Sequence, residues 1–360
     1  MKKSAKGVAH VLRGGTDTLD FPDIRPLNID RYAKIISTGT GIPEKIVTNT
    51  DLIEKYNIMA TDRAVQYSLG IKERRWVRPD QKHDELMAEA VSECLERAGV
   101  GIKSVDRVIC SRLLSDYHIP SAAVGVLRRL GAKVGTPGFD ICAACSGFIH
   151  AMDLAVRHIA TGDDYVLIIG GGITSKGIQN MEEINPKTVF LFGDAFAAML
   201  IGHSDTKHFL ASYIFTNPYL YDNAYIPCGT SLLNSSSAKL NFDIFNMTIE
   251  DGNLIQKSSV EYAKVISEKL LKAVELSIED IDFFVTSDQS TKIWEEQLKA
   301  IGIPHEKSLS LFHKYGNTVS AMSPLNFDGL VREGRIKRGK IVMMMSHGAG
   351  ASSGGMIFRY

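Results

Sequence analysis

The sequence carries no excess of charge of either sign. Its 360 residues include 41 lysines and arginines and 41 aspartates and glutamates, so the formal net charge at pH 7 is zero. A protein without a global electrostatic field lacks the usual attraction for nucleic acid or an anionic membrane. We therefore expect no nucleic-acid partner. Hydrophobic residues make up 44% of the chain and charged residues 23%, as in ordinary globular proteins.

Long hydrophobic runs are also missing. Apolar stretches such as 341–345 and 166–169 are far shorter than the roughly 20 residues that cross a bilayer. The amino-terminal sequence MKKSAKGVAHVLRGG lacks the apolar core of a secretory signal. The five cysteines are odd in number and scattered, which disfavours a disulfide framework. These absences predict a cytoplasmic protein with reduced thiols and no membrane partner.

Residues 1–32 are polar and show no sustained hydrophobic period, so we treat them as an N-terminal extension. From Tyr32 onward, apolar segments alternate with amphipathic ones, a pattern typical of an α/β protein. The segment 33–42 is expected to begin with a strand.

Two parts of the chain resemble each other. Residues 85–116 and 260–290 each show a helix pattern, a break and a β-rich strand. A charged turn and an apolar strand ending in glycines follow each of them, at 162–172 and 339–350. Such spacing also arises by chance in α/β proteins, but the repetition favours a duplication. The halves would span about 33–205 and 206–360.

The most distinctive segment is FDICAACSGFIHAMDLAVRHI at 139–159. A β-rich run meets small residues and then a helical period, and Cys145 lies at this junction. A thiol at a helix N-terminus faces the partial positive charge of unpaired amides, which lowers its pKa. This pattern indicates a nucleophilic cysteine.

Other interpretations of this cysteine compete with that one. Cysteine is often a small core residue, and Cys142 and Cys145 also form a C-x-x-C pair that suggests a redox or zinc site. No second C-x-x-C or histidine pair stands at ligand spacing, which disfavours a metal site. Cys142 is expected to be a strand residue that points into the core.

The segment resembles the active-site motif of the ketoacyl-acyl carrier protein synthase III family, within the thiolase superfamily. Further stretches agree in order and spacing, so the resemblance extends over about residues 33–360. They are TGTGIPEKIVTNTDL (38–52), LGIKERRWV (69–77), LFGDAFAAMLIG (191–202), YGNTVSAMSP (315–324) and GAGASSGGMIFRY (348–360).

The resemblance implies a five-layered αβαβα thiolase fold with two similar halves, a homodimer, and no cofactor or metal. Cys145 would be acylated by a thioester and would pass the acyl group to a second substrate, typically malonyl-acyl carrier protein. The backbone amides of Cys145 and Ala349 would hold the tetrahedral oxyanion. The segment 120–122 resembles the loop that reaches across the dimer and shapes the partner's acyl pocket.

One departure from the family concerns a catalytic histidine. The family pairs its cysteine with a histidine and with an asparagine in Y-G-N-T. The asparagine is present as Asn317, but Asp288 stands where the histidine is expected. An ionised aspartate cannot donate a hydrogen bond to a thioester carbonyl. Asp288 therefore argues against routine chain elongation; it could accept a proton, donate one if protonated, or be a relic of a lost step.

A second departure from the family could compensate for the missing histidine. Immediately before the terminal Gly-Ala-Gly, where the family has a phenylalanine, this chain has His347. We consider His347 a relocated imidazole that takes the Cys145 proton or binds the acceptor. The alternative is a histidine that serves only in packing.

The donor site also differs from the family. The tryptophan and arginine that grip coenzyme A match approximately Ala64 and Ser68, and a further arginine matches Ile293. Loss of this clamp favours an acyl carrier protein as donor, acceptor or both. Basic residues matching the family's carrier-docking face remain as Lys257 and Lys299, with Lys292 nearby, although surface lysines are often merely solvated.

The sequence therefore predicts an acyltransferase of specialised metabolism that works through an acyl-Cys145 intermediate on small-molecule or carrier thioesters. A carbon nucleophile is favoured as acceptor because Asn317 persists. Ester or amide formation, a non-catalytic subunit that pairs with an active homologue, and a thioester hydrolase are the alternatives.

Overall fold

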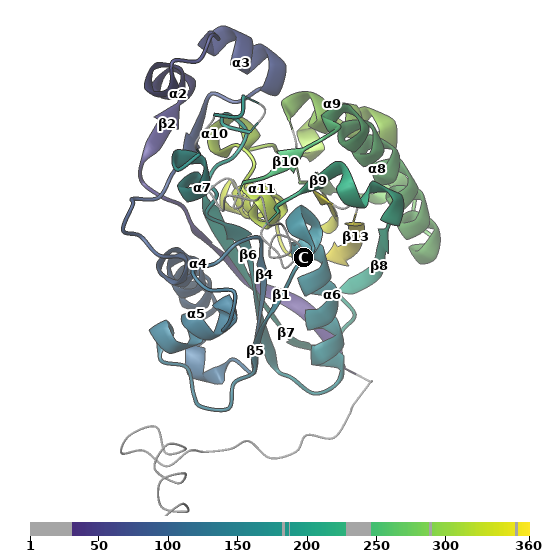
Figure 1. The fold of residues 1–360 in the computed structure, drawn as a ribbon. Helices are drawn as coiled ribbons and strands as arrows, with labels where there is room; N and C mark the ends of the chain where they lie inside the picture. Colours follow the sequence, from purple (N-terminus) through teal and green to yellow (C-terminus); the bar gives the residue numbers. More distant parts are fainter. Residues whose placement is uncertain (1–30, 182–183, 187, 228–245, 288–289, 350–351) are drawn as a thin grey trace, which may run out of the picture.

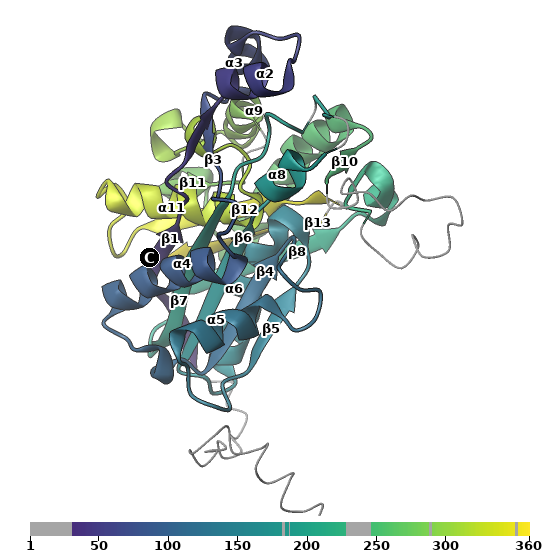
Figure 2. The same cartoon turned by 60° about the vertical axis from the view of Figure 1, so that its left-hand side comes forward.

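The structure is a computed structural model that describes residues 31–181, 184–186, 188–227, 246–287, 290–349 and 352–360. Apart from its last two positions, the N-terminal extension lies outside the described residues. Two β-sheets alternate with layers of helices in the rest of the chain (Figures 1 and 2).

The first sheet has five strands in the order β1-β7-β6-β4-β5. Strand β6 is parallel to β4, and β4 is parallel to β5, whereas β7 runs antiparallel to both β6 and β1. Among the described residues, β5 forms one edge of this sheet. The bounds are β1 Tyr32–Gly41, β7 Ala195–Ser204, β6 Tyr165–Gly172, β4 Arg107–Arg112 and β5 Gly138–Ile141.

The second sheet repeats this arrangement in the order β8-β13-β12-β11. Strand β12 is parallel to β11, and β13 is antiparallel to both β12 and β8. A parallel bridge from Phe284 to Ser308 stands where β5 stands in the first sheet. The matching strand order supports a duplicated unit. The bounds are β8 Phe209–Thr216, β13 Ser352–Arg359, β12 Ile341–His347 and β11 Phe283–Val285.

Strand β12 shows how the layers form. Successive side chains of a strand point to opposite faces, so a run of apolar residues fills two cores. Val342 and Met344 belong to a core between the sheets, together with residues of the central helices α6 (Gly147–Ala160) and α11 (Met322–Arg332). Met343 and Met345 instead pack against the outer helices α8 (Gly252–Val274) and α9 (Thr291–Ile301).

The outer face of the first sheet is covered in the same way. Helices α4 (His83–Ala98) and α5 (Ala122–Leu130) share a buried core with β4, β6 and β7. Helix α4 ends at Ala98 and is followed by Gly99, whose positive φ of 65° suits glycine at a helix C-terminus. The resulting order of helix, sheet, helix, sheet, helix confirms the expected five-layered αβαβα thiolase fold.

Shorter elements border the region where the two sheets meet. Figure 1 shows α2 and α3 at one end of the molecule and the pair β9 and β10 beside α8. Within the described part of the chain, no helix has both the length and the apolar character needed to cross a membrane. The remaining bounds are β2 Ile46–Thr48, β3 Glu73–Arg75, β9 Ala224–Tyr225, β10 Thr248–Ile249, α2 Asn49–Tyr56, α3 Asp62–Leu69, α7 Ser175–Gln179, α10 Phe312–Tyr315, and the 3-10 helices η1 Ile102–Ser104, η2 Ala144–Ser146, η3 Pro218–Asn223, η6 Ile278–Asp280, η7 His305–Lys307 and η8 Val319–Ala321.

Candidate active site

Cys145 lies on a tight turn between β5 and α6, as the sequence predicted. Its neighbour Ala144 has a positive φ of 46°, a region that residues with a side chain rarely adopt. Gly348 packs against the same turn, where an added Cβ would lie 2.8 Å from the carbonyl oxygen of Ala143. The end of β12 therefore supports the backbone on which Cys145 stands, and local strain at this turn is typical of functional sites.

The expected lowering of the Cys145 pKa is wrong. Burial in the apolar surroundings of the turn raises the pKa of this thiol to about 11, because the thiolate loses its hydration. Hydrogen bonds from the backbone and from Asn317 oppose this effect without overcoming it. The resting residue is a thiol at neutral pH.

The expectation for Cys142 is also wrong. Its side chain is exposed rather than directed into the core. Cys142 follows β5, which ends at Ile141 and forms an edge of the first sheet among the described residues.

Asn317 is held in place by backbone pairing from a distant segment. Its backbone N–H donates to the Leu191 carbonyl at 2.8 Å, and Phe192 forms a bridge with it. Its side-chain oxygen accepts from the N–H of Val319 at 2.8 Å. This arrangement leaves the amide N–H₂ of Asn317 to donate toward Cys145, which lowers the pKa of the thiol.

His347 ends β12 and is only 3% exposed. Its backbone N–H donates to the Ser287 hydroxyl at 2.9 Å, and its Nδ1 lies 3.3 Å from the Ser353 hydroxyl. Burial lowers the pKa of His347 to about 4, so the ring is neutral at pH 7. Neither serine was predicted; Ser353 lies within the quoted motif 348–360, but its contact with the ring depends on the pairing of β12 with β13.

These pKa values bear on the two roles considered for His347. Moving a proton from a thiol with a pKa of about 11 to an imidazole with a pKa of about 4 costs on the order of 10 kcal/mol. His347 is therefore a poor resting base for Cys145. Its second role, contact with the acceptor, fits a neutral ring.

The side chains converge on one cavity of about 430 Å³. Cys145, Asn317, His347 and Ala349 all line it, as do apolar residues such as Leu191 and Phe192. Asp288 lies outside the described residues, so its role stays a prediction. The remaining lining residues include Leu69, Ala224, Met247, Glu250, Asp251, Asn253, Ile255 and Gln256.

The three lysines predicted for carrier docking lie on the adjoining helices α8 and α9. Lys257 is exposed on α8, while Lys292 and Lys299 are exposed on α9. Lys292 lies 3.9 Å from Glu296 in a pair one helical turn apart. Gln256, which precedes Lys257 on α8, lines the cavity.

The structure also describes the positions that match the coenzyme A-binding residues of the family. Ile293 is 3% exposed and packs into the interior, whereas Ala64 and Ser68 are exposed on α3. Neither a small nor a buried apolar side chain can stack on an adenine ring. In the part of the chain that the structure describes, no group of three or more histidine, cysteine, aspartate and glutamate side chains is placed to hold a metal ion.

Comparison with known proteins gives matches over most of the chain. The family model described as 3-oxoacyl-[acyl-carrier-protein (ACP)] synthase III matches residues 139–218, and the model for its C-terminal part matches residues 271–360. The chain is 31% identical over 329 residues to a β-ketoacyl-[acyl-carrier-protein] synthase III of Alkalilimnicola ehrlichii, covering 91% of this chain and 99% of the relative.

Further matches agree with this one. A β-ketoacyl-[acyl-carrier-protein] synthase III of Enterobacter sp. is 30% identical over 333 residues, covering 91% of this chain and all of the relative. The crystal structure of 3-oxoacyl-[acyl-carrier-protein] synthase III from Aquifex aeolicus superposes with a TM-score of 0.82 at 28% identity, over 91% of this chain and all of that one. Identity at this level over nearly the whole chain shows that the protein belongs to the β-ketoacyl-acyl carrier protein synthase III family of condensing acyltransferases.

Proposed function

We propose that the protein loads an acyl group on Cys145 and transfers it to a carbon nucleophile, such as a malonyl- or ketoacyl-carrier protein thioester, in a specialised biosynthetic pathway. The observation that carries this proposal is the convergence of Cys145, Asn317, His347 and Ala349 on one cavity. The proposed role in a specialised pathway rests on Asp288 and on the altered donor site.

In the loading step, the sulfur of Cys145 attacks the carbonyl carbon of the donor thioester. The thiol proton passes to the departing donor thiol, so the products are acyl-Cys145 and the free donor thiol. The backbone amides of Cys145 and Ala349 would stabilise the oxyanion between these states. Because the thiol is protonated at rest, its deprotonation is part of the attack rather than a prior equilibrium.

In the transfer step, the acceptor enters the side of the cavity that His347 borders. The Asn317 amide would donate to the acceptor's carbonyl oxygen, as the family resemblance implies. The neutral ring of His347 would accept a hydrogen bond from the acceptor. Asp288 would act as the proton acceptor in place of the family's histidine.

An acyl carrier protein is the proposed donor, acceptor or both. Relatives that match nearly the whole chain are named for this substrate. The exposed Lys257, Lys292 and Lys299 would attract an acidic carrier to the helices beside the cavity. Ile293 is buried and apolar, so it cannot take the place of the arginine that the family resemblance expects at this position.

We further propose a homodimer in the cytoplasm. Strand β5 forms a sheet edge among the described residues, and large apolar side chains next to it are exposed: Tyr117 by 67%, Ile119 by 83% and Val124 by 43%. Exposed apolar clusters of this kind mark contact surfaces.

The experiment that tests the proposal is intact-protein mass spectrometry after incubation with acyl-carrier protein and acyl-coenzyme A thioesters of several lengths. A mass increase that disappears in Cys145→Ala would establish the acyl-enzyme, and the best donor would give carrier preference and chain length. If no donor labels the folded protein, the acyltransferase proposal is wrong, and a non-catalytic partner subunit becomes the better hypothesis.

A further inference from the structure

The orientation of the Asn317 amide depends on the turn that follows it. An asparagine side chain carries a carbonyl oxygen on one side and an N–H₂ group on the other, and only the N–H₂ group can donate a hydrogen bond. The backbone N–H of Val319 donates to that carbonyl oxygen at 2.8 Å. This bond occupies the oxygen, so the N–H₂ group is the part of the amide that donates to Cys145. A flipped amide would set its N–H₂ group against the N–H of Val319, which places two donors together.

The backbone at Val319 is strained. Its φ is +59°, a conformation that a β-branched residue rarely adopts. Such a conformation costs about 1–3 kcal/mol and persists only where the surrounding structure enforces it. Val319 is 1% exposed and belongs to the apolar cluster against which Cys145 packs. The strained residue therefore lies within the active site.

Backbone pairing fixes the chain before Val319. The N–H of Asn317 donates to the Leu191 carbonyl at 2.8 Å, and the carbonyl of Asn317 accepts from the N–H of Gly193 at 3.1 Å. Both backbone groups of Asn317 are thus tied to the 191–193 segment. The turn cannot relax by moving this end without breaking these hydrogen bonds.

A single side chain, that of the fully buried Ser320, fixes the chain after Val319. Its hydroxyl accepts from the backbone N–H of Gly171 in β6 at 2.8 Å and donates to the carbonyl of Ser111 in β4 at 3.0 Å. Two such hydrogen bonds together stabilise the fold by about 1–3 kcal/mol. This contribution matches the cost of the strain, so the Ser320 hydroxyl is strong enough to hold Val319 in its unusual conformation.

We propose that Val319 and Ser320 are positioning residues for Asn317: the Ser320 hydroxyl holds the left-handed backbone at Val319, and this backbone keeps the N–H₂ group of Asn317 directed toward Cys145. Without the hydroxyl, Val319 would relax to a negative φ. Rotation about its N–Cα bond would turn its N–H away from the Asn317 oxygen, and the amide would lose its fixed orientation. The use of that amide in acyl transfer rests on the proposed function.

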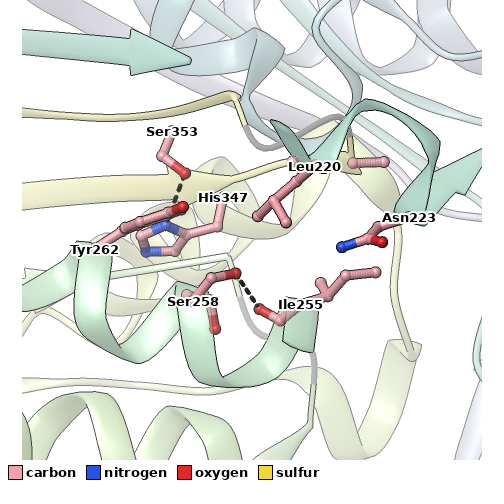
Figure 3. A pocket seen from close by; sticks show the side chains of 10 residues that line it. Leu220, Asn223, Ile255, Ser258, Tyr262, His347 and Ser353 are labelled. Carbon is pink, nitrogen blue, oxygen red and sulfur yellow. Dashed lines mark hydrogen bonds between the residues drawn. The ribbon is translucent and has the colours of Figure 1, made fainter. Parts of the chain in front are cut away.

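His347, at the same cavity, is held in a different way. Figure 3 looks into a smaller pocket that shares His347 with the catalytic cavity and that Asn223 and Tyr262 also line. The ring lies beside the hydroxyl of Ser353, on the neighbouring strand β13. Regular strand pairing positions His347, whereas Asn317 depends on the turn at Val319.

The test is the rate at which iodoacetamide alkylates Cys145 at about pH 8, which reports the thiolate fraction that the Asn317 amide increases. We expect Ser320→Ala to slow alkylation roughly tenfold, as for loss of one hydrogen bond to the thiolate. In a protein that already carries Asn317→Ala, Ser320→Ala should have no further effect, because it acts through Asn317. Additive effects of the two substitutions, or a wild-type rate in Ser320→Ala, would overturn the proposal.

Ser323→Ala is the matched control. Ser323 is 1% exposed, and its hydroxyl lies 2.8 Å from that of Ser346. The substitution therefore also removes a buried hydroxyl and its hydrogen bond, but it leaves the anchor of Val319 intact. This variant should react like wild type. If it slows alkylation as much as Ser320→Ala does, Ser320 has no specific role.

Glycine at position 319 separates positioning from packing. The double variant Val319→Gly/Ser320→Ala loses a buried side chain as well as the hydroxyl, but glycine adopts a positive φ without support. We expect it to recover most of the wild-type alkylation rate and to lose this rate again when Asn317→Ala is added. A double variant slower than Ser320→Ala, or one that Asn317→Ala does not slow, would contradict the proposal.

The same double variant decides the matter if Ser320→Ala alone does not fold, since its response to Asn317→Ala can still be measured. Alkylation involves no acyl donor. Failure of the protein to form acyl-enzyme would therefore overturn the proposed function and leave the result on Asn317 unaffected.

Discussion

The Cys145 thiol is subject to opposing influences. Burial raises its pKa to about 11, while hydrogen bonds from its own backbone and from Asn317 lower it. The balance leaves little thiolate at neutral pH, so the resting Cys145 side chain is not a permanently reactive thiolate.

This balance predicts the pH dependence of alkylation. Below the pKa, the thiolate fraction rises about tenfold per pH unit, so the rate of Cys145 modification by iodoacetamide should keep rising between about pH 7 and pH 10. Peptide-resolved mass spectrometry separates this reaction from that of the exposed Cys142. A plateau near neutral pH would contradict the raised pKa.

Asn317 gives a second prediction at the same site. Asn317→Ala removes a hydrogen bond that lowers the pKa of Cys145, so the thiolate fraction at about pH 8 should fall by roughly tenfold. The alkylation rate measures this change. Asn253→Ala, an exposed asparagine at the same cavity, serves as the control and should react like wild type.

Because burial lowers the pKa of His347, we expect the free energy of unfolding to depend on pH. Its pKa is about 4 in the folded protein and about 6.5 when unfolded, so between these values the unfolded chain binds more protons. The free energy of unfolding should fall by about 3 kcal/mol as the pH drops from about 6.5 to 4. His347→Phe should lose this contribution. Urea unfolding of both proteins over that range measures the difference, and parallel pH profiles would refute it.

At the scale of elements, Asp194 connects several segments that lie far apart in the sequence. Its buried carboxylate accepts hydrogen bonds from the backbone N–H groups of Val77 at 2.9 Å, Thr174 at 2.8 Å and Ser175 at 3.0 Å, and also from the Ser175 hydroxyl. These residues follow β3, follow β6 and begin α7. The carboxylate therefore fixes the ends of elements that belong to different parts of the chain.

Asp194→Asn places an amide group against these donors and leaves part of them unsatisfied. We expect the free energy of unfolding to fall by about 3 kcal/mol, measured by urea titration. Asp205→Asn is the matched control, since the Asp205 side chain at the end of β7 is 97% exposed and should change stability by less than about 0.5 kcal/mol. Equal effects of the two substitutions would mean that Asp194 has no special role.

At the scale of the whole molecule, the exposed apolar residues beside β5 predict self-association. Ile119→Asp puts a charge on a side chain that is 83% exposed, so it should not disturb the folded monomer but should disrupt a dimer formed at this edge. Sedimentation measures the mass of both forms. Tyr67→Asp, at a residue that is 94% exposed on α3, is the control and should stay dimeric. A monomeric wild-type protein would contradict the proposal.

The lysines on α8 and α9 give a prediction for carrier recognition. Replacing Lys257 and Lys299 by glutamate reverses two exposed charges on α8 and α9, and we expect the KM for an acyl-carrier protein to rise at least tenfold with little change in kcat. Lys207→Glu, at an exposed residue between β7 and β8, controls for net charge. Raised salt should weaken the wild-type interaction and leave the double variant less affected.

Local patterns in the sequence were enough to predict several features. The alternation of apolar segments predicted β1, and the repeated order of helix and strand predicted α4 with β4 and α8 with β11. The change from a β-rich run to a helical period placed Cys145 at a strand-to-helix turn. These features depend on residues close together in the chain, whose periodicity determines local structure.

The tertiary structure determined the electrostatics of the candidate site and which residues surround it. The sequence suggested a lowered pKa for Cys145 and a buried Cys142, and both were wrong because burial depends on how distant segments pack. No sequence signal placed Asn223 and Tyr262, from different elements, in one pocket with His347. The sequence by itself determined which elements form and where Cys145 stands. Only the folding of β12, α8 and the 191–193 segment around it decided its hydration, and hydration sets the free energy of a buried charge.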